Sequence, residues 1–259
     1  MADKTARKEN GLWETIKTIF WALLIAGLFR TLLFQPFWIP SGSMKDTLLI
    51  GDFLFVNKMA YGYSSVSCPF ALCPISGRIL ERTPERGDVV VFRHPQRNVD
   101  FIKRLIGLPG DRVQMRGGIL WINGEEVPQT PNGSYVERMD PRAARSEFFG
   151  CNNAPGTAEG ECHVDRYTET LPNGVSHDVL NMMDGGPADN TAEFTVPQGH
   201  YFFMGDNRDN SEDSRFSNVG MIPAENLIGR AEFVLFSSAG NSLLYFWTWR
   251  ADRFFKGVN

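Results

Sequence analysis

The sequence predicts a mainly β protein, in which an N-terminal transmembrane helix precedes an antiparallel β-sheet domain with an inserted smaller subdomain. A strongly apolar segment near the N-terminus is long enough to cross a bilayer. Short apolar runs between turn residues follow it, in a chain with 25 glycines, 15 prolines and 12% aromatic residues, as is typical of β structure. Residues 128–192 interrupt this pattern with a stretch rich in Pro, Asn, Gly, Asp and Glu.

The predicted transmembrane anchor covers residues 18–38, and Pro36 prevents the helix from continuing further. Basic residues precede the segment, so the positive-inside rule assigns residues 1–17 to the cytoplasm and the remainder to the outside. A cleaved signal peptide is the alternative, because Ser41-Gly42-Ser43 has the small-x-small form of a cleavage site. That site lies well past the apolar run, so we favour a retained anchor.

The rest of the chain divides into a main β domain, an insertion and a tail. The main domain comprises 39–127 and 193–240, because strand patterns recur on both sides of the insertion at 128–192. Residues 241–259 form an aromatic tail, which either packs on the core as a strand or helix or lies at the membrane interface. The predicted strands are 52–58, 89–92, 99–106, 112–115, 119–122, 125–127, 193–196, 200–204 and 229–236.

Ser43 is the candidate nucleophile, since it follows the apolar segment by only a few residues and would therefore work at the membrane surface. Gly42 allows the backbone to approach a substrate closely. The Ser43 N–H and the Ser41 hydroxyl are candidate oxyanion donors, each typically worth about 3–4 kcal/mol. The alternative is a turn of small residues after a membrane helix.

Lys103 is the candidate base that a serine nucleophile requires. On a strand it shares one face with Phe101 and Leu105, and burial among apolar neighbours lowers the pKa of a lysine amine. A serine–lysine pair is a variant of the catalytic triad. The alternatives are an ordinary charged pair with Arg104 at a strand edge, or one of four histidines as base. These are His94, His163, His177 and His200, none in a favourable local setting.

The loop 205–215 is dense in Asp, Asn and Arg and directly follows an apolar strand. Its spacing does not match an EF-hand, so we expect a hydrogen-bonded network rather than a calcium site. Ser211 is a candidate for orienting a lysine, with Asp213 and Arg215 as an ion pair beneath it.

The cysteines occur as two local pairs, Cys68 with Cys73 and Cys151 with Cys162. Two small disulfides in an oxidising compartment fit this arrangement, and reduced thiols or a zinc site are the alternatives. No pair has CxxC spacing, and we expect neither a metal nor a cofactor. The net charge of −4 gives no indication of a nucleic-acid partner.

Together these segments resemble bacterial type I signal peptidase, the leader peptidase family of serine proteases with a Ser-Lys dyad. The resemblance covers nearly the whole chain in order. Five motifs carry it: I-P-S-G-S-M (39–44), T-L-L-I-G-D (47–52), R-G-D-V-V-V-F (86–92), F-I-K-R-L-I-G-L-P-G-D (101–111) and G-D-N-R-D-N-S-E-D-S-R (205–215).

The resemblance implies that Ser43 is the nucleophile, Lys103 the general base, and Ser41 with the Ser43 amide the oxyanion hole. It also implies that Ser211 orients the lysine and that Asp213 and Arg215 support it. The positions that match apolar substrate pockets, which would accept Ala-x-Ala before the scissile bond, are Phe37, Ile39, Pro40, Met44, Leu48, Val91, Phe101 and Ile102.

The implied activity is the removal of signal peptides from exported preproteins through an acyl-enzyme on Ser43. The implied partners are preprotein signal peptides and the lipid bilayer, and we expect a monomer. The implied location is the bacterial inner membrane, with a single span and a periplasmic catalytic domain. Asp46 departs from the family, which usually has proline there, and Lys45 precedes it.

A protein of another class also fits part of the sequence. A non-enzymatic, membrane-tethered β module that binds extended peptides would have the same anchor, β composition and disulfides. It does not explain why a serine, a lysine and the Asx-rich loop occur as one ordered set.

Overall fold

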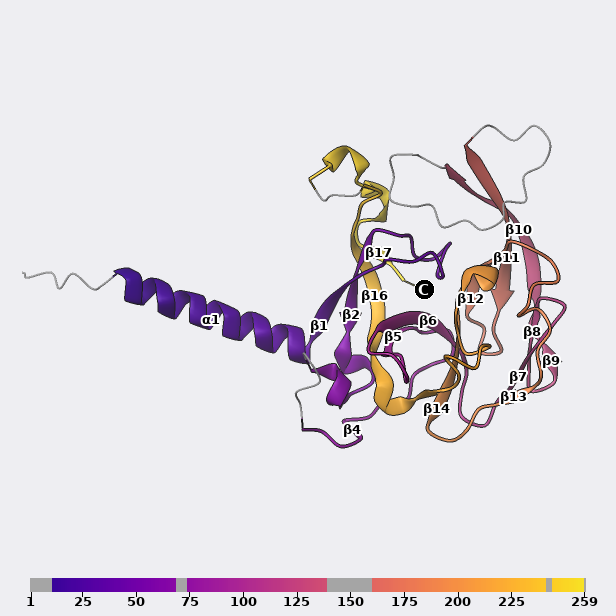
Figure 1. The fold of residues 1–259 in the computed structure, drawn as a ribbon, viewed down its shortest axis with the longest axis horizontal. Helices are drawn as coiled ribbons and strands as arrows, with labels where there is room; N and C mark the ends of the chain where they lie inside the picture. Colours follow the sequence, from indigo (N-terminus) through magenta and orange to yellow (C-terminus); the bar gives the residue numbers. More distant parts are fainter. Residues whose placement is uncertain (1–10, 69–73, 139–159, 241–243, 259) are drawn as a thin grey trace, which may run out of the picture.

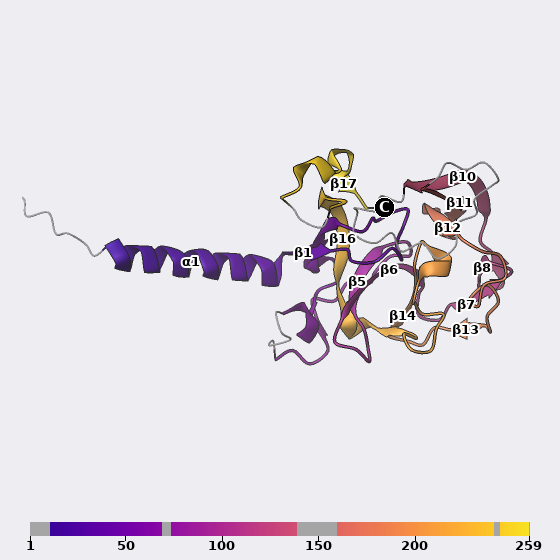
Figure 2. The ribbon, with the colours of Figure 1, turned by 45° about the horizontal axis from the view of Figure 1, so that its top comes forward.

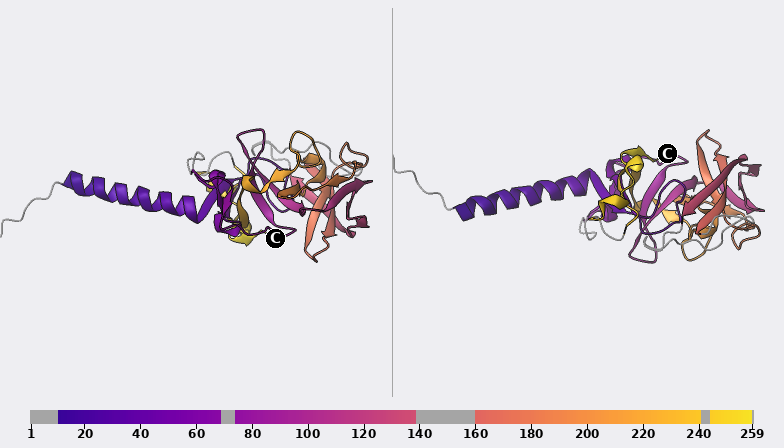
Figure 3. Two further views of the ribbon diagram at one scale, coloured as in Figure 1. Left: turned by 90° about the horizontal axis from the view of Figure 1, so that it is seen from below. Right: turned by 90° about the horizontal axis from the view of Figure 1, so that it is seen from above.

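The computed structural model describes residues 11–68, 74–138, 160–240 and 244–258. A single helix, α1 (Gly11–Leu32), extends away from a body built of β-strands (Figure 1). Figure 3 shows α1 projecting from the same end of the body in two further views. The confirmed fold class is mainly β, with one N-terminal helix that is apolar enough to span a membrane.

Helix α1 has 22 residues, none of them buried against the rest of the chain, and a mean hydropathy of 1.5. At 1.5 Å per residue it is about 33 Å long, close to the thickness of a bilayer's hydrocarbon core. Its bounds differ from the predicted anchor at 18–38, because it begins earlier, at Gly11, and ends at Leu32. The chain then enters strand β1 (Phe34–Trp38), since Pro36 cannot continue a helix but is tolerated in a strand at the edge of a sheet.

The main sheet is antiparallel and has the order β1–β2–β16–β5–β6–β14–β15, with β17 also paired to β16. Strand β6 lies between β5 and β14, so it is an interior strand of this sheet. The further bounds are β2 (Asp52–Asn57), β5 (Val89–Arg93), β6 (Asp100–Gly107), β14 (His200–Met204), β15 (Ile222–Pro223), β16 (Leu227–Ser237) and β17 (Lys256–Gly257).

Smaller sheets complete the described body. A four-stranded sheet has the order β13–β7–β8–β9, and a three-stranded sheet has the order β10–β11–β12. The latter lies within the predicted insertion, for which the sequence indicated no strands. The remaining bounds are β3 (Tyr63–Ser64), β4 (Arg78–Ile79), β7 (Arg112–Arg116), β8 (Ile119–Ile122), β9 (Glu125–Glu126), β10 (Gln129–Arg138), β11 (Glu161–Thr170), β12 (Ser176–Asn181) and β13 (Phe194–Thr195).

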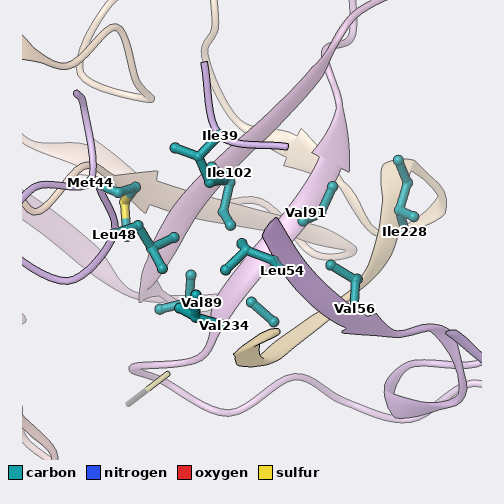
Figure 4. Close-up of a cluster of buried hydrophobic side chains, with 11 residues drawn as sticks. Ile39, Met44, Leu48, Leu54, Val56, Val89, Val91, Ile102, Ile228 and Val234 are labelled. Atoms are coloured by element: carbon teal, nitrogen blue, oxygen red, sulfur yellow. The ribbon is translucent and has the colours of Figure 1, made fainter. Parts of the chain in front are cut away.

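One apolar cluster connects the main sheet to the loop that follows β1. Figure 4 shows Ile39, Met44 and Leu48 from this loop together with strand residues that include Val91 and Ile102. Met44 and Leu48 are completely buried. Because removing a buried Leu or Met typically costs 2–5 kcal/mol, these side chains fix the loop firmly on the sheet.

The C-terminal tail both packs on the main sheet and exposes aromatic side chains. It contains short 3₁₀ helices η6 (Phe246–Thr248) and η7 (Ala251–Arg253) before β17. Arg253 forms a buried ion pair with Asp52, with its Nη2 2.6 Å from Oδ2. Phe246 and Trp247 are 68% and 69% exposed.

Candidate active site

Ser43 lies in the loop between β1 and β2, and its side chain is 6% exposed. The loop is held at both ends, because the Ile39 N–H donates to the Asp52 carbonyl at 2.9 Å and the Leu48 N–H donates to the Met44 carbonyl at 2.8 Å. With Met44 buried directly beside it, the serine backbone has little freedom to move. Its hydroxyl reaches the cleft described below.

Lys103 reaches Ser43 from the interior strand β6. Its Nζ donates to the Ser43 Oγ at 2.6 Å and to the Ile102 carbonyl at 3.0 Å. The side chain is 4% exposed, and burial lowers the pKa of Lys103 to about 8, against the opposing effect of Asp213 and Asp206. A lysine with this pKa holds an appreciable fraction of free amine near neutral pH, which is the form that can accept a proton.

Ser41 lies on the same side of the cleft as Ser43, with the two Oγ atoms 3.4 Å apart. The described histidines have other surroundings. The His94 Nδ1 accepts from the N–H groups of Gln96 and Arg97, and the His200 Nδ1 lies 3.1 Å from the Gln198 carbonyl. Among the described residues, the hydrogen-bond partners of the Ser43 hydroxyl are therefore Lys103 and Ser41.

The loop 205–215 packs directly on the loop between β1 and β2 that carries Ser43 (residues 39–51), which we call the serine loop. The Asn207 N–H donates to the Ser43 carbonyl and the Asn207 Nδ2 donates to the Gly42 carbonyl, both at 3.2 Å. A Cβ at Gly205 would lie 2.2 Å from the Ser211 Oγ and 2.5 Å from the Ser43 carbonyl oxygen. Glycine at position 205 is therefore what permits this close approach.

Asp213 and Arg215 form a buried, bidentate ion pair. The Arg215 Nε and Nη2 lie 2.8 and 2.9 Å from the two carboxylate oxygens, and the Gly205 N–H donates to one of them at 3.0 Å. Burial alone raises the pKa of Asp213, but Arg215 reverses this and holds it below its usual value. Asp213 is consequently a fixed negative charge near Lys103.

Ser211 lines the cleft with Ser43 and Lys103, but the described structure forms no hydrogen bond between its hydroxyl and the lysine. Its buried Oγ makes no hydrogen bond of regular geometry among the described residues, but it lies close enough to Asp213 to help lower the pKa of that carboxyl. Its orienting role stays a prediction.

A buried ion pair that the sequence did not reveal lies next to Ser43 and Lys103. The Arg104 Nε and Nη2 lie 2.8 and 2.7 Å from the two carboxylate oxygens of Asp206, and the Thr47 hydroxyl donates to the same carboxylate at 2.5 Å. Arg104 is next to Lys103, and Thr47 belongs to the serine loop. This pair therefore joins β6, the serine loop and the 205–215 loop.

The three-stranded sheet contributes a second buried pair. Glu169 of β11 accepts from the Arg208 Nη1 and Nη2 at 2.8 and 2.6 Å. The Arg208 carbonyl in turn accepts from the Arg215 Nη2 at 2.5 Å. His177 of β12 lies nearby, and burial lowers its pKa to about 4. The Glu169–Arg208 pair was not predicted, because nothing local in the sequence indicates that residues 169 and 208 meet.

An open cleft of about 690 Å³ runs along these residues. Of the predicted pocket residues, six line it: Phe37, Ile39, Pro40, Val91, Phe101 and Ile102. Met44 and Leu48 do not line it, because they are fully buried in the core cluster beneath the serine loop. The lining is apolar beside Ser43 and polar at Ser41, Asn210 and Ser211. Clefts of this size, with a largely apolar lining and a few polar groups, are typical of ligand-binding sites.

Cys68 and Cys162 each take part in a disulfide bond. Their predicted partners, Cys73 and Cys151, lie outside the described residues, so the pairing stays a prediction. Within the described ranges, no group of three or more His, Cys, Asp or Glu side chains could hold a metal ion.

Comparisons with known proteins agree on one family. A family model described as "Signal peptidase, peptidase S26" matches residues 12–236. A signal peptidase I from Rickettsia akari (strain Hartford) is 40% identical over 248 residues, which cover 92% of this chain and 83% of the relative. A signal peptidase I from Rickettsia bellii (strain OSU 85-389) is 40% identical over 231 residues, covering 86% and 72% of the two chains.

A crystal structure of a signal peptidase I from Enterococcus faecalis V583 is 25% identical, covers 57% of this chain and 97% of its own, and has a TM-score of 0.31. The family assignment rests on the sequence matches, which extend from the apolar helix to strand β16. The chain belongs to the signal peptidase family, peptidase S26, and is a hydrolase of that family.

Proposed function

We propose that this protein is a membrane-bound serine endopeptidase that cleaves N-terminal signal peptides from exported preproteins by a Ser43/Lys103 dyad. One observation carries the proposal: the buried Lys103 amine lies 2.6 Å from the Ser43 hydroxyl. Supporting evidence comes from the family match and from an apolar cleft beside that serine.

The reaction begins with the neutral amine of Lys103, which accepts the proton of the Ser43 hydroxyl as Oγ attacks the scissile carbonyl carbon. The Ser43 N–H and the Ser41 hydroxyl donate to the resulting oxyanion. The Lys103 ammonium then gives its proton to the leaving amine, the new N-terminus of the mature protein, and an ester between the signal peptide and Ser43 remains. Water, deprotonated by Lys103, hydrolyses this ester and restores the serine.

Support for the lysine comes from two directions. Its burial on β6 lowers the pKa, and the Asp213 carboxylate, held in place by Arg215, limits how far the pKa falls. We propose that Ser211 orients the amine when a substrate fills the cleft, since its buried side chain lines the cleft together with Ser43 and Lys103. The apolar part of the cleft favours small side chains before the scissile bond, as in an Ala-x-Ala motif.

The enzyme is proposed to act as a monomer in the bacterial inner membrane, with α1 as a single span. Residues before α1 would be cytoplasmic and the β body periplasmic, which agrees with the basic N-terminal residues and the disulfide-bonded cysteines. Exposed aromatic side chains of the tail suit contact with the lipid headgroups.

The decisive experiment is processing of a preprotein by the full chain in detergent. Ser43→Ala and Lys103→Ala should each abolish cleavage while the circular dichroism spectrum and thermal midpoint remain those of a folded protein. Substitution of His94 or His200 should leave processing intact. Full activity of the Lys103 variant would refute the dyad, and loss in the His94 variant alone would indicate a histidine-dependent mechanism.

A further inference from the structure

Two consecutive residues of the loop that carries the candidate nucleophile, Lys45 and Asp46, contact the three-stranded sheet through ion pairs. The Lys45 Nζ lies 2.7 Å from the Glu137 Oε2 of β10, and the Arg166 Nη1 of β11 lies 3.2 Å from the Asp46 Oδ2. Lys45 is 1% exposed, whereas the carboxylate and guanidinium partners are partly exposed. A buried ammonium that close to a carboxylate makes a short, charge-assisted hydrogen bond.

The stem of Lys45 also packs against the turn that holds Ser43. A Cβ at Gly42 would lie only 3.1 Å from the Lys45 Cε, and the Lys45 N–H donates to the Gly42 carbonyl at 3.1 Å. Gly42 and Lys45 thus enclose Ser43 and Met44 in one tight turn. The Lys45 side chain therefore lies against the turn that sets the position of the Ser43 N–H and hydroxyl.

We propose that the Lys45–Glu137 and Asp46–Arg166 ion pairs position the Ser43 nucleophile, which makes the three-stranded sheet a support for the reacting groups. Residues 45, 46, 137 and 166 act through Ser43 and are positioning residues. This inference rests on the proposed function of Ser43 and adds four residues that the family resemblance did not supply.

An effect on the position of Ser43 can be separated from an effect on the pKa of Lys103, because different charges are involved. Lys103 has its pKa lowered by burial, while Asp213, Asp206 and Glu212 raise it and Arg215 lowers it. The two ion pairs at 45–46 are not among these charges. Breaking them should therefore reduce the rate of the chemical step without moving the pH at which the lysine loses its proton.

The test uses the full chain in detergent with a preprotein substrate and measures kcat, KM and the pH dependence of kcat for Glu137→Gln, Lys45→Met and the double variant. We expect each single change to lower kcat about tenfold or more, because a displacement of the order of 1 Å at reacting atoms can cost 10²-fold. KM should change by less than about twofold and the midpoint of the pH profile should stay in place.

The double variant should lose less than the product of the two single losses, since it removes both charges and keeps an apolar stem under Gly42. Glu193→Gln is the matched control, because it removes a carboxylate from the half-exposed pair with Arg112, 3.6 Å apart, on the four-stranded sheet. Its kcat should equal that of the unmodified protein. Arg166→Gln breaks the second ion pair, Asp46–Arg166, which is more exposed, so we expect a smaller loss of kcat.

Three results would overturn the inference. The first is a kcat within twofold of that of the unmodified protein in both Glu137→Gln and Arg166→Gln. The second is a loss of kcat in each variant that matches its unfolded fraction. The third is a double variant whose loss equals the product of the two single losses. Activity in Ser43→Ala would instead refute the proposed function itself, so the two failures are distinguishable.

Discussion

The part of the body next to α1 and the part farthest from it supply different things to the candidate site. The main sheet, adjacent to the helix in Figures 1 and 2, surrounds Lys103 with apolar side chains and removes it from water. The three-stranded sheet, on the side of the body away from α1, supplies charged side chains, among them Glu137, Arg166 and Glu169. Burial lowers the pKa of a lysine so that it can act as a base, whereas ion pairs hold loops in position. We call the main sheet around Lys103 the dry region and the three-stranded sheet with its ion pairs the charged region. The two regions meet at Ser43.

The largest effect should come from placing a permanent cation in the dry region. Lys103→Arg keeps a positive charge, but a guanidinium does not release its proton at any pH the protein tolerates. Because general-base catalysis is typically worth 10²–10⁴-fold, we expect kcat for preprotein cleavage to fall by about 10³-fold or more. Single-turnover kinetics on the full chain would measure this. Retention of a tenth of the activity would contradict a basic role for this residue.

The next largest effect should come from breaking the fully buried pair of the charged region. Glu169→Gln leaves Arg208 buried without its carboxylate, and such a change typically lowers the free energy of unfolding by about 3–5 kcal/mol. Urea denaturation of the full chain in detergent would measure the loss. Glu193→Gln, in a half-exposed pair, should cost less than about 1 kcal/mol.

The same substitution also has a defined pH dependence. Burial alone raises the pKa of Glu169, but Arg208 reverses this and the pKa lies below its usual value. The stabilisation is therefore present above the unfolded-state pKa and disappears as pH falls through the lower folded-state pKa. The difference between the two proteins should shrink on acidification, and a constant difference would exclude an ionised Glu169.

A smaller effect should appear in the pH profile of kcat. The unmodified protein should gain activity as pH rises through about 8, where Lys103 loses its proton. Asp213 raises the pKa of Lys103, so Asp213→Asn should move the midpoint to lower pH, by about one unit for an interaction of about 1.4 kcal/mol. A midpoint that stays fixed would indicate that Asp213 acts only by holding Arg215.

The smallest effect should come from the surface of the region next to α1. Phe246→Ser with Trp247→Ser removes two exposed aromatic rings from the tail. With α1 still anchoring the chain, we expect a loss of about twofold on a preprotein in anionic vesicles. Activity in detergent should not change. Equal rates in vesicles would show that the tail does not contribute to membrane contact.

The sequence predicted the dry region well because its signals are local. Strands β5, β6 and β14 appear where apolar runs follow turn residues, as predicted. Alternation along the strand predicted one buried face that carries Lys103. In the structure Ile102 through Gly107 are all buried, because the interior strand β6 is covered on both faces. Lys103 and Arg104 are consequently both buried, and each has partners from other segments.

The charged region could not be predicted, for a physical reason. Strands β10 to β12 consist largely of polar residues that pair with one another, so their sequences lack the apolar period that indicates a strand. Glu169 meets Arg208, and Lys45 meets Glu137, across long sequence separations. Only the three-dimensional fold brings such charges together. The end of the helix was placed too late: the predicted span runs to residue 38, whereas α1 ends at Leu32 and Pro36 lies within strand β1.

The short passage from helix to sheet has a consequence for where a substrate is cut. Only Leu33 separates α1 from β1, and the Tyr63 hydroxyl donates to the Leu32 carbonyl at 2.5 Å. Phe34 stacks on Phe55 of β2 with ring centroids 4.5 Å apart, so the junction is braced on the sheet. If α1 is the proposed membrane span, this bracing holds Ser43 at a fixed height above the lipid. The proposed peptidase would then cleave the bond that a substrate presents at that height.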